Sequence, residues 1–142
     1  MRGLISAVVF AGCAYHPGSF TSLAGDFPHT RTTVGCVDVG VGFGRTDHGA
    51  VVAYEFGNRC DRNITLDLAT VHVVGRDADG HERPLVAFDP REEIRPLPLA
   101  ARWWGEEQIA YTDAESTPLV AVCVEIGGLD ASRPRAEQWV CP

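Results

Sequence analysis

The sequence lacks the motifs by which many enzymes and nucleic-acid-binding proteins are recognised. It has no Gly-x-Ser-x-Gly elbow, no His-Glu-x-x-His, and no glycine loop followed by a helix that could hold a phosphate. It also has no cluster of basic residues, and its formal net charge is −7, so a nucleic acid is not an expected partner. These absences argue against an enzyme, and they give no reason to expect a cofactor or a metal ion.

The histidines and acidic residues that could form a catalytic or metal site are not grouped for that purpose. His48, His72 and His81 fall in or beside expected turns, at no ligand spacing. Asp77-Ala78-Asp79-Gly80 has the first acidic positions of a calcium loop but not the later ones. The acidic residues of segment 89–93 are flanked by arginines, which is typical of a solvated loop. We expect surface histidines, a plain turn at Asp79-Gly80 and an ordinary loop.

The N-terminus has the layout of a secretory signal. Arg2 supplies a positive charge, residues 4–10 form an almost unbroken apolar run, and Ala11 and Gly12 place two small residues before Cys13. The apolar run is too short to span the roughly 30 Å hydrocarbon core of a bilayer as a permanent helix. Residues 1–12 are therefore predicted to be a removable signal peptide.

Phe10-Ala11-Gly12-Cys13 resembles the lipobox of bacterial lipoproteins, with Phe10 where the family usually has Leu. The resemblance covers residues 1–13 and implies that Cys13 receives a diacylglyceryl group and becomes the mature N-terminus. It also implies a lipid-anchored protein of the bacterial cell envelope, whose membrane is then a partner. Ala14 after the cysteine favours the outer membrane over the inner one. An ordinary secretory signal cut nearby, or a buried N-terminal strand, is the alternative.

A polar segment separates the lipobox from the first strand pattern. Residues 13–33 are rich in Gly, Ser, Thr and Pro and have no hydrophobic period, which predicts a lipidated cysteine followed by a flexible tether. Twenty such residues have a root-mean-square span of about 25 Å. Residues 34–142 then have the size of one folded domain.

Alternation of apolar and small or polar residues predicts strands throughout this domain, and no stretch has a convincing helical period. The clearest case is segment 36–43, where Val and Phe alternate with Cys, Asp and Gly. A second strand at 50–56 follows a turn-rich segment, so the two should form an antiparallel hairpin. Further strands are expected at 64–68, 71–76, 81–86, 108–112, 119–126 and 138–141.

The connections between these strands predict the fold class. Asp79-Gly80 is the strongest hairpin turn in the sequence, and the apolar face changes near Ala69-Thr70, which indicates a bend. The proline-rich segment 89–105 indicates a crossover between two sheets. We predict an all-β fold, an antiparallel sandwich of about seven strands whose architecture resembles the immunoglobulin or fibronectin type III class.

Four cysteines remain once Cys13 is assigned to the lipid: Cys36, Cys60, Cys123 and Cys141. No Cys-x-x-Cys occurs, so a zinc site is not indicated, and an even set in an exported domain predicts two disulfides. A hairpin turning about Asp47 brings Cys36 within reach of Cys60, and one turning about Ala131 brings Cys123 close to Cys141. That pairing is favoured, and pairing Cys36 with Cys141 and Cys60 with Cys123 is the main alternative.

Arg102, Trp103 and Trp104 are the candidate binding surface. Two adjacent large aromatic residues cannot easily both face one core, and Trp and Arg are over-represented at protein interfaces. Alternatively, Trp104 caps the sandwich and Trp103 covers one of its edges. Trp139, beside Cys141, is expected in the core.

The sequence favours a non-catalytic binding or structural module of the cell envelope, with another envelope protein as its partner. Two alternatives remain open. One is a protease inhibitor whose segment 91–99 enters an active site, and the other is a carbohydrate-binding accessory domain that stacks its tryptophans on sugar rings.

Overall fold

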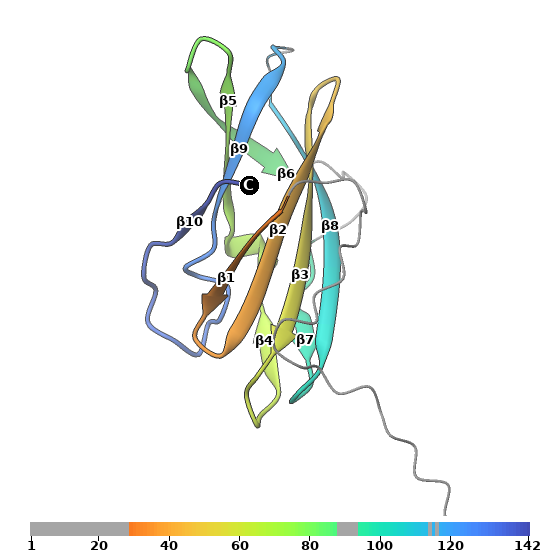
Figure 1. Cartoon of the computed structure of the whole chain (residues 1–142), viewed down its shortest axis with the longest axis vertical. Helices are drawn as coiled ribbons and strands as arrows, with labels where there is room; N and C mark the ends of the chain where they lie inside the picture. The colour runs from red at the N-terminus through yellow and green to blue at the C-terminus, as the bar shows by residue number, and fades with distance from the viewer. Residues whose placement is uncertain (1–28, 88–93, 114, 116) are drawn as a thin grey trace, which may run out of the picture.

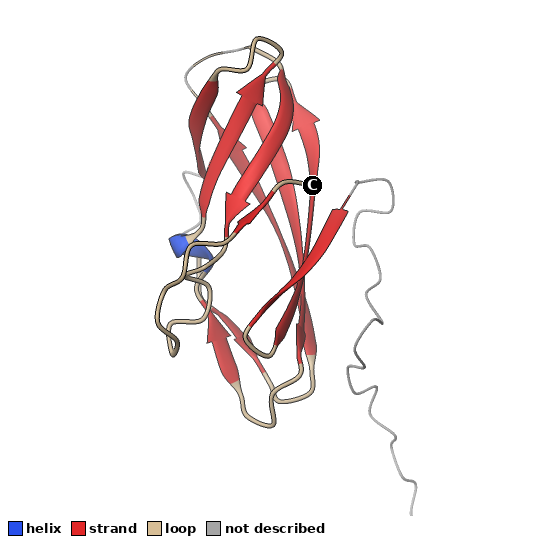
Figure 2. Cartoon of the chain, turned by 60° about the vertical axis from the view of Figure 1, so that its left-hand side comes forward, coloured by secondary structure: helices blue, strands red, loops and turns tan. Residues whose placement is uncertain are grey.

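The computed structural model describes residues 29–87, 94–113, 115 and 117–142, and these residues form an all-β domain with one short 3-10 helix (Figures 1 and 2). The predicted signal peptide and lipidation site, residues 1–12 and Cys13, lie outside the described residues. The elements are β1 (His29–Val34), β2 (Val37–Thr46), β3 (Gly49–Asn58), β4 (Ile64–Leu66), η1 (Leu68–Thr70), β5 (His72–Asp77), β6 (Glu82–Ala87), β7 (Leu97–Leu99), β8 (Trp104–Thr112), β9 (Leu119–Glu125) and β10 (Trp139–Val140).

Eight of these strands form one antiparallel sheet in the order β1-β2-β3-β8-β6-β5-β9-β10, and β4 pairs with β7 in a separate small sheet. The large sheet is strongly curled (Figure 1). Strand β6 makes the corner, because it pairs with β5 along four residues and with β8 only at Val86 and Ala87. At the two edges, the Gln138 side chain beside β10 donates to Thr32 Oγ1 at 2.9 Å and to the Thr33 carbonyl at 3.1 Å.

The core fills the space inside this curl. Side chains of β2 and β3 such as Val41 and Phe56 belong to the same buried cluster as Val73 of β5 and Val124 of β9. The largest fully buried side chains are Tyr54, Phe56, Leu66, Leu68, Ile126 and Leu129. The two four-strand halves of the sheet therefore face one another across a single core, with alternate residues of each strand supplying it.

Two buried tyrosines hydrogen-bond to each other within this core. The hydroxyl oxygens of Tyr54 and Tyr111 lie 2.9 Å apart, which joins β3 to β8. Burial raises the pKa of both tyrosines, and the neighbouring Tyr111 raises that of Tyr54 further. Each hydroxyl thus has a partner, as a buried polar group requires.

The predicted hairpins are confirmed. Strands β2 and β3 pair along their whole length around Asp47-His48, and β5 and β6 flank Asp79-Gly80, where Gly80 has φ +85°. The predicted bend at Ala69-Thr70 is η1, whose N-cap Asp67 accepts the Ala69 N–H at 3.1 Å. Local turn chemistry was sufficient to place these features.

The described residues form ten strands rather than about seven, and the segment predicted as a crossover contains β7 and the start of β8. Strand β1 starts at His29, so the sheet begins five residues before the expected domain boundary at Val34. It contains Thr and Arg and little apolar side chain, because an edge strand is held mainly by its ladder with β2. Strand β8 begins at Trp104 rather than at Gln108, since β3 offers a partner along all nine residues.

The structure pairs Cys36 with Cys60 and Cys123 with Cys141, which is the pairing that the spacing favoured. Cys36 lies one residue beyond the last β2–β3 pair, with its Cα 5.5 Å from that of Cys60. Trp139 lies opposite Glu125, so the same register places Cys141 directly across from Cys123, with 4.2 Å between the Cα atoms. Both disulfides join neighbouring segments of the sheet.

Glu125 is a buried carboxylate that sequence reasoning did not single out, and its residue is only 3% exposed. It accepts the N–H groups of Gly127 at 2.6 Å and Gln138 at 3.1 Å, and it pairs with Arg135. Burial alone would raise the pKa of Glu125, but these N–H groups and the Arg135 charge lower it. The carboxylate thereby holds the loop between β9 and β10 in place.

Candidate functional site

Two loops meet at the lower end of the molecule in Figure 1: residues 59–63 between β3 and β4, and residues 100–103 between β7 and β8. We call this the loop end. Asn58, at the last position of β3 and fully buried, holds both loops. Its Nδ2 lies within hydrogen-bonding distance of the carbonyls of Arg62 (3.0 Å), Leu99 (3.2 Å) and Ala100 (2.9 Å), and its Oδ1 accepts the Cys60 N–H at 2.8 Å.

The second of these loops is a tight turn that leads into β8. The Trp103 N–H donates to the Ala100 carbonyl at 3.1 Å, and the Asn58 N–H donates to the Trp103 carbonyl at 2.8 Å. Arg102 has φ +58°, a left-handed conformation that costs a non-glycine residue about 1 to 2 kcal/mol. Its guanidinium donates to Asp61 Oδ1 from Nε at 3.0 Å and from Nη2 at 2.6 Å. These contacts fix the turn despite its backbone strain.

The three consecutive residues of the predicted binding surface lie at the loop end. Trp103 is 44% exposed and Trp104 is 46% exposed, so neither belongs to the core. Trp104 lies opposite Gly57 in the β3–β8 ladder, where the neighbouring strand has no side chain to cover it. The prediction for Trp139 was wrong: it is 44% exposed and lies on the two-residue edge strand β10, which has a neighbouring strand on one side only.

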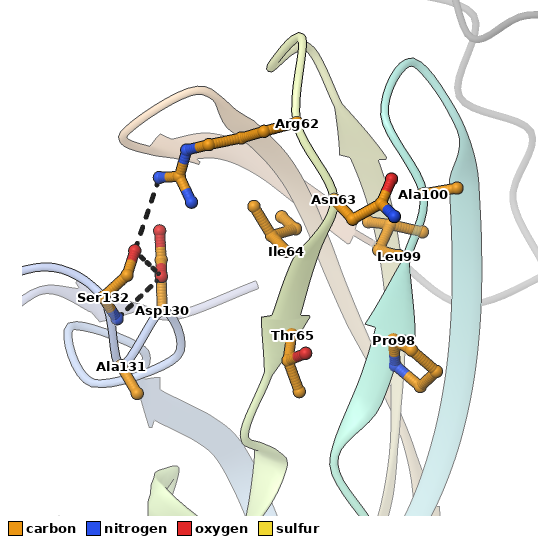
Figure 3. Close-up of a pocket in the computed structure, with 10 residues that line it drawn as sticks. All are labelled: Arg62, Asn63, Ile64, Thr65, Pro98, Leu99, Ala100, Asp130, Ala131 and Ser132. Atoms are coloured by element: carbon orange, nitrogen blue, oxygen red, sulfur yellow. Dashed lines mark hydrogen bonds between the residues drawn. The ribbon is translucent and has the colours of Figure 1, made fainter.

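A groove lies beside this surface, between the small β4–β7 sheet and the loop at residues 130–132 (Figure 3). Its volume is about 680 Å³. Ile64 and Leu99, both buried, and Pro98 form its apolar wall, and polar side chains come from Arg62, Thr65, Asp130 and Ser132. The groove opens where β4 separates from the 130–132 loop, just beyond the isolated bridge between Leu66 and Asp130.

Asp130 is the unusual residue of this groove, because its carboxylate is buried but only half hydrogen-bonded. The residue is 4% exposed, and its Oδ1 accepts the N–H of Ser132 at 3.0 Å and the Ser132 hydroxyl at 2.6 Å. Its Oδ2 is buried and has no hydrogen-bond partner among the described residues. In Figure 3 this oxygen points toward the guanidinium of Arg62, which itself lies 3.4 Å from Ser132 Oγ.

Sequence reasoning missed both Asn58 and Asp130. Asp130-Ala131-Ser132 is a recognisable turn sequence, since Asp accepts N–H groups two residues on, but that pattern does not reveal the second oxygen. Asn58 follows the strand predicted at 50–56, so the sequence indicated a loop residue, whereas the structure makes it the last residue of β3. Its role depends on residues 99 and 100, which only the fold brings near.

Asp77, Asp79 and His81 bring three potential ligand atoms within 4.8 Å of one another at the β5–β6 turn. The Asp77 carboxylate already accepts the N–H groups of Asp79 at 2.9 Å and His81 at 3.0 Å, and it pairs with Arg83 at 3.2 Å. Burial opposes ionisation of Asp77, but these hydrogen bonds and the nearby charges lower its pKa. The cluster therefore serves as the predicted turn.

The segment proposed for a protease-inhibiting loop is only partly described. Residues 91–93 lie outside the described residues, and residues 97–99 form β7, which pairs with β4. Leu99 at the end of this segment is 2% exposed. Residues 97–99 are thus built into the fold, whereas residues 94–96 belong to no strand, and Arg95 and Pro96 are exposed.

Comparisons with known proteins add no name to this site. No protein-family model, curated protein or solved structure matches the chain. Among the described residues, no helix is long and apolar enough to cross a membrane.

Proposed function

We propose that this protein is a lipid-anchored module of the bacterial cell envelope that binds another envelope protein and catalyses no reaction. The observation that carries the binding part is the pair Trp103 and Trp104, each nearly half exposed, on a turn fixed by buried Asn58. Trp and Arg are the residue types that contribute most to binding at protein interfaces. A turn already held in one conformation loses little entropy when a partner binds, which favours affinity.

The arrangement of the sheet and its loops supports this proposal. We propose that the curled sheet is an immunoglobulin-like sandwich, and the two four-strand halves facing one core support this. In such domains the loops gather at the two ends of the sandwich, and Trp103 lies in one of these loops. Binding through the loop end leaves the sheet itself unaltered.

We expect the double substitution Trp103→Ala and Trp104→Ala to weaken partner binding at least tenfold while leaving the domain folded. The oxidised protein would be immobilised and exposed to an envelope extract, and the proteins it retains would be identified by mass spectrometry. The affinity for the identified partner would then be measured with purified proteins.

Trp139→Ala is the matched control, because Trp139 is equally exposed but lies on the edge strand β10. It should retain the same partner with unchanged affinity. Retention of that partner by the double variant at wild-type affinity would contradict the proposed surface. A glycan array run with the same three proteins tests the carbohydrate-binding alternative, which requires the double variant to lose a sugar ligand instead.

The proposed location has its own test, and the two disulfides support an oxidising compartment. We expect the full chain, produced in a bacterial host and extracted from its membranes, to begin at Cys13 and to carry an acyl mass. Four further thiols should react with a label only after reduction. A protein that still begins at Met1 with reactive thiols would contradict both the anchor and the exported location.

A further inference from the structure

We propose that the groove between β4, β7 and the loop at residues 130–132 binds a small organic cation that has a primary ammonium group and an apolar chain. This site is separate from the tryptophan surface, so it does not depend on the proposed partner binding. The inference rests on Asp130, on the apolar wall of the groove and on the position of Arg62.

Asp130 supplies the recognition chemistry. Ser132 uses its N–H and hydroxyl to satisfy Oδ1, and this fixes the orientation of the carboxylate. Oδ2 remains a buried acceptor with no hydrogen-bond partner among the residues that the structure describes. A buried carboxylate oxygen without a hydrogen bond raises the free energy of the folded protein. A positively charged N–H donor offsets this best, because charge-assisted hydrogen bonds are the strongest.

The other lining groups make a metal ion or an anion a poor fit. Calcium requires six to eight oxygen ligands. The side chains that line the groove offer only the Asp130 carboxylate, the hydroxyls of Thr65 and Ser132, and the Asn63 amide oxygen. An anion would face the buried Asp130 charge. A compact ammonium needs only one to three acceptors, which this groove offers.

The wall opposite Asp130 is suited to an apolar chain. Ile64 and Leu99 are buried and belong to the core cluster, so their side chains are held firmly in place. Pro98, which lies opposite Thr65 in the β4–β7 ladder, adds an exposed ring. Burial of an alkyl chain against this surface contributes roughly 0.8 kcal/mol for each methylene removed from water.

Arg62 lies on the side of the groove toward which Asp130 Oδ2 points (Figure 3). Its side chain is exposed and reaches Ser132 Oγ only at 3.4 Å, a distance typical of a weak contact. Its positive charge opposes the approach of a second cation to the Asp130 carboxylate. Shortening this side chain and removing its charge should therefore favour the ammonium ligand.

The test is a titration of the oxidised full-length protein with n-hexylammonium, followed by NMR at the backbone amides of Ile64, Thr65 and Ser132. We expect saturable shifts at these amides. Hexyltrimethylammonium, which has the charge but no N–H donor, should bind more weakly, and hexanoate should cause no saturable shift. The substitution Asp130→Asn should weaken hexylammonium binding at least tenfold, and Arg62→Gln should strengthen it severalfold.

Equal binding of hexylammonium and hexanoate, or undiminished binding by a folded Asp130→Asn variant, would overturn the proposal. So would the absence of a saturable shift at millimolar hexylammonium. Arg62→Gln keeps the test decisive if Asp130→Asn does not fold, because it alters only an exposed side chain and leaves the Arg62 carbonyl that Asn58 contacts. Failure of Arg62→Gln to strengthen binding would then refute the site.

Discussion

Replacing Asn58 with alanine is expected to lower the free energy of unfolding by about 4 kcal/mol. The side chain is fully buried. Its Nδ2 lies within hydrogen-bonding distance of the carbonyls of Arg62, Leu99 and Ala100, and its Oδ1 accepts the Cys60 N–H. Alanine provides no replacement, and each buried group that loses its partner costs about 1 to 3 kcal/mol. The variant should also bind the proposed partner less tightly, since the turn before Trp103 loses its support.

Urea unfolding at neutral pH, followed by tryptophan fluorescence, measures this change. Asn63→Ala is the matched control, because Asn63 is exposed and its Oδ1 accepts only the Ala101 N–H at 3.0 Å among the described contacts. We expect that variant to lose no more than about 1 kcal/mol. Equal losses for the two variants would show that Asn58 does not organise the loop end.

Removing the Cys36–Cys60 disulfide by a double alanine substitution should lower the free energy of unfolding by more than about 3 kcal/mol. The disulfide closes a segment with a sequence separation of 24, which restricts the unfolded chain by about that amount. Cys60 is itself 7% exposed and part of the core, so its truncation adds a packing loss. The loop between Arg59 and Asn63 should become more mobile as a result.

The Cys123–Cys141 disulfide offers a direct comparison. Its sequence separation is 18, so its removal should lower the free energy of unfolding by nearly the same amount through the entropy of the unfolded chain. Cys141 is exposed, however, so its truncation leaves little cavity. The double alanine variant of this pair should therefore be the more stable of the two in urea unfolding. An equal or larger loss for Cys123 and Cys141 would refute the contribution of Cys60 packing.

The sequence was sufficient for features that depend on neighbouring residues. The alternation of Val39, Val41 and Phe43 with glycine predicted β2, and the turn residues Asp79-Gly80 predicted the β5–β6 hairpin, because these patterns act within a few residues. The cysteine pairing followed from the same local information, since each disulfide closes one hairpin or one short connection. Lipidation of Cys13 stays a prediction.

Features that depend on distant segments could not be predicted in the same way. Strand β1 has almost no apolar pattern and exists because β2 offers it a ladder. Asn58 and Asp130 are polar residues beside strand ends, where such residues are usually solvated. Asn58 is buried when residues 99–100 fold over it, and Asp130 is buried when its own loop meets Leu66 of β4. No local pattern encodes those contacts.

The contact of Gln138 with β1 has a consequence for self-association. An open sheet edge can recruit a strand from another molecule, and this sheet has edges at β1 and β10. Strand β10 is only two residues long, and the Gln138 amide beside it occupies the Thr33 carbonyl. A second copy of the chain that approaches this edge would have to displace the Gln138 amide before its own backbone could pair with Thr33.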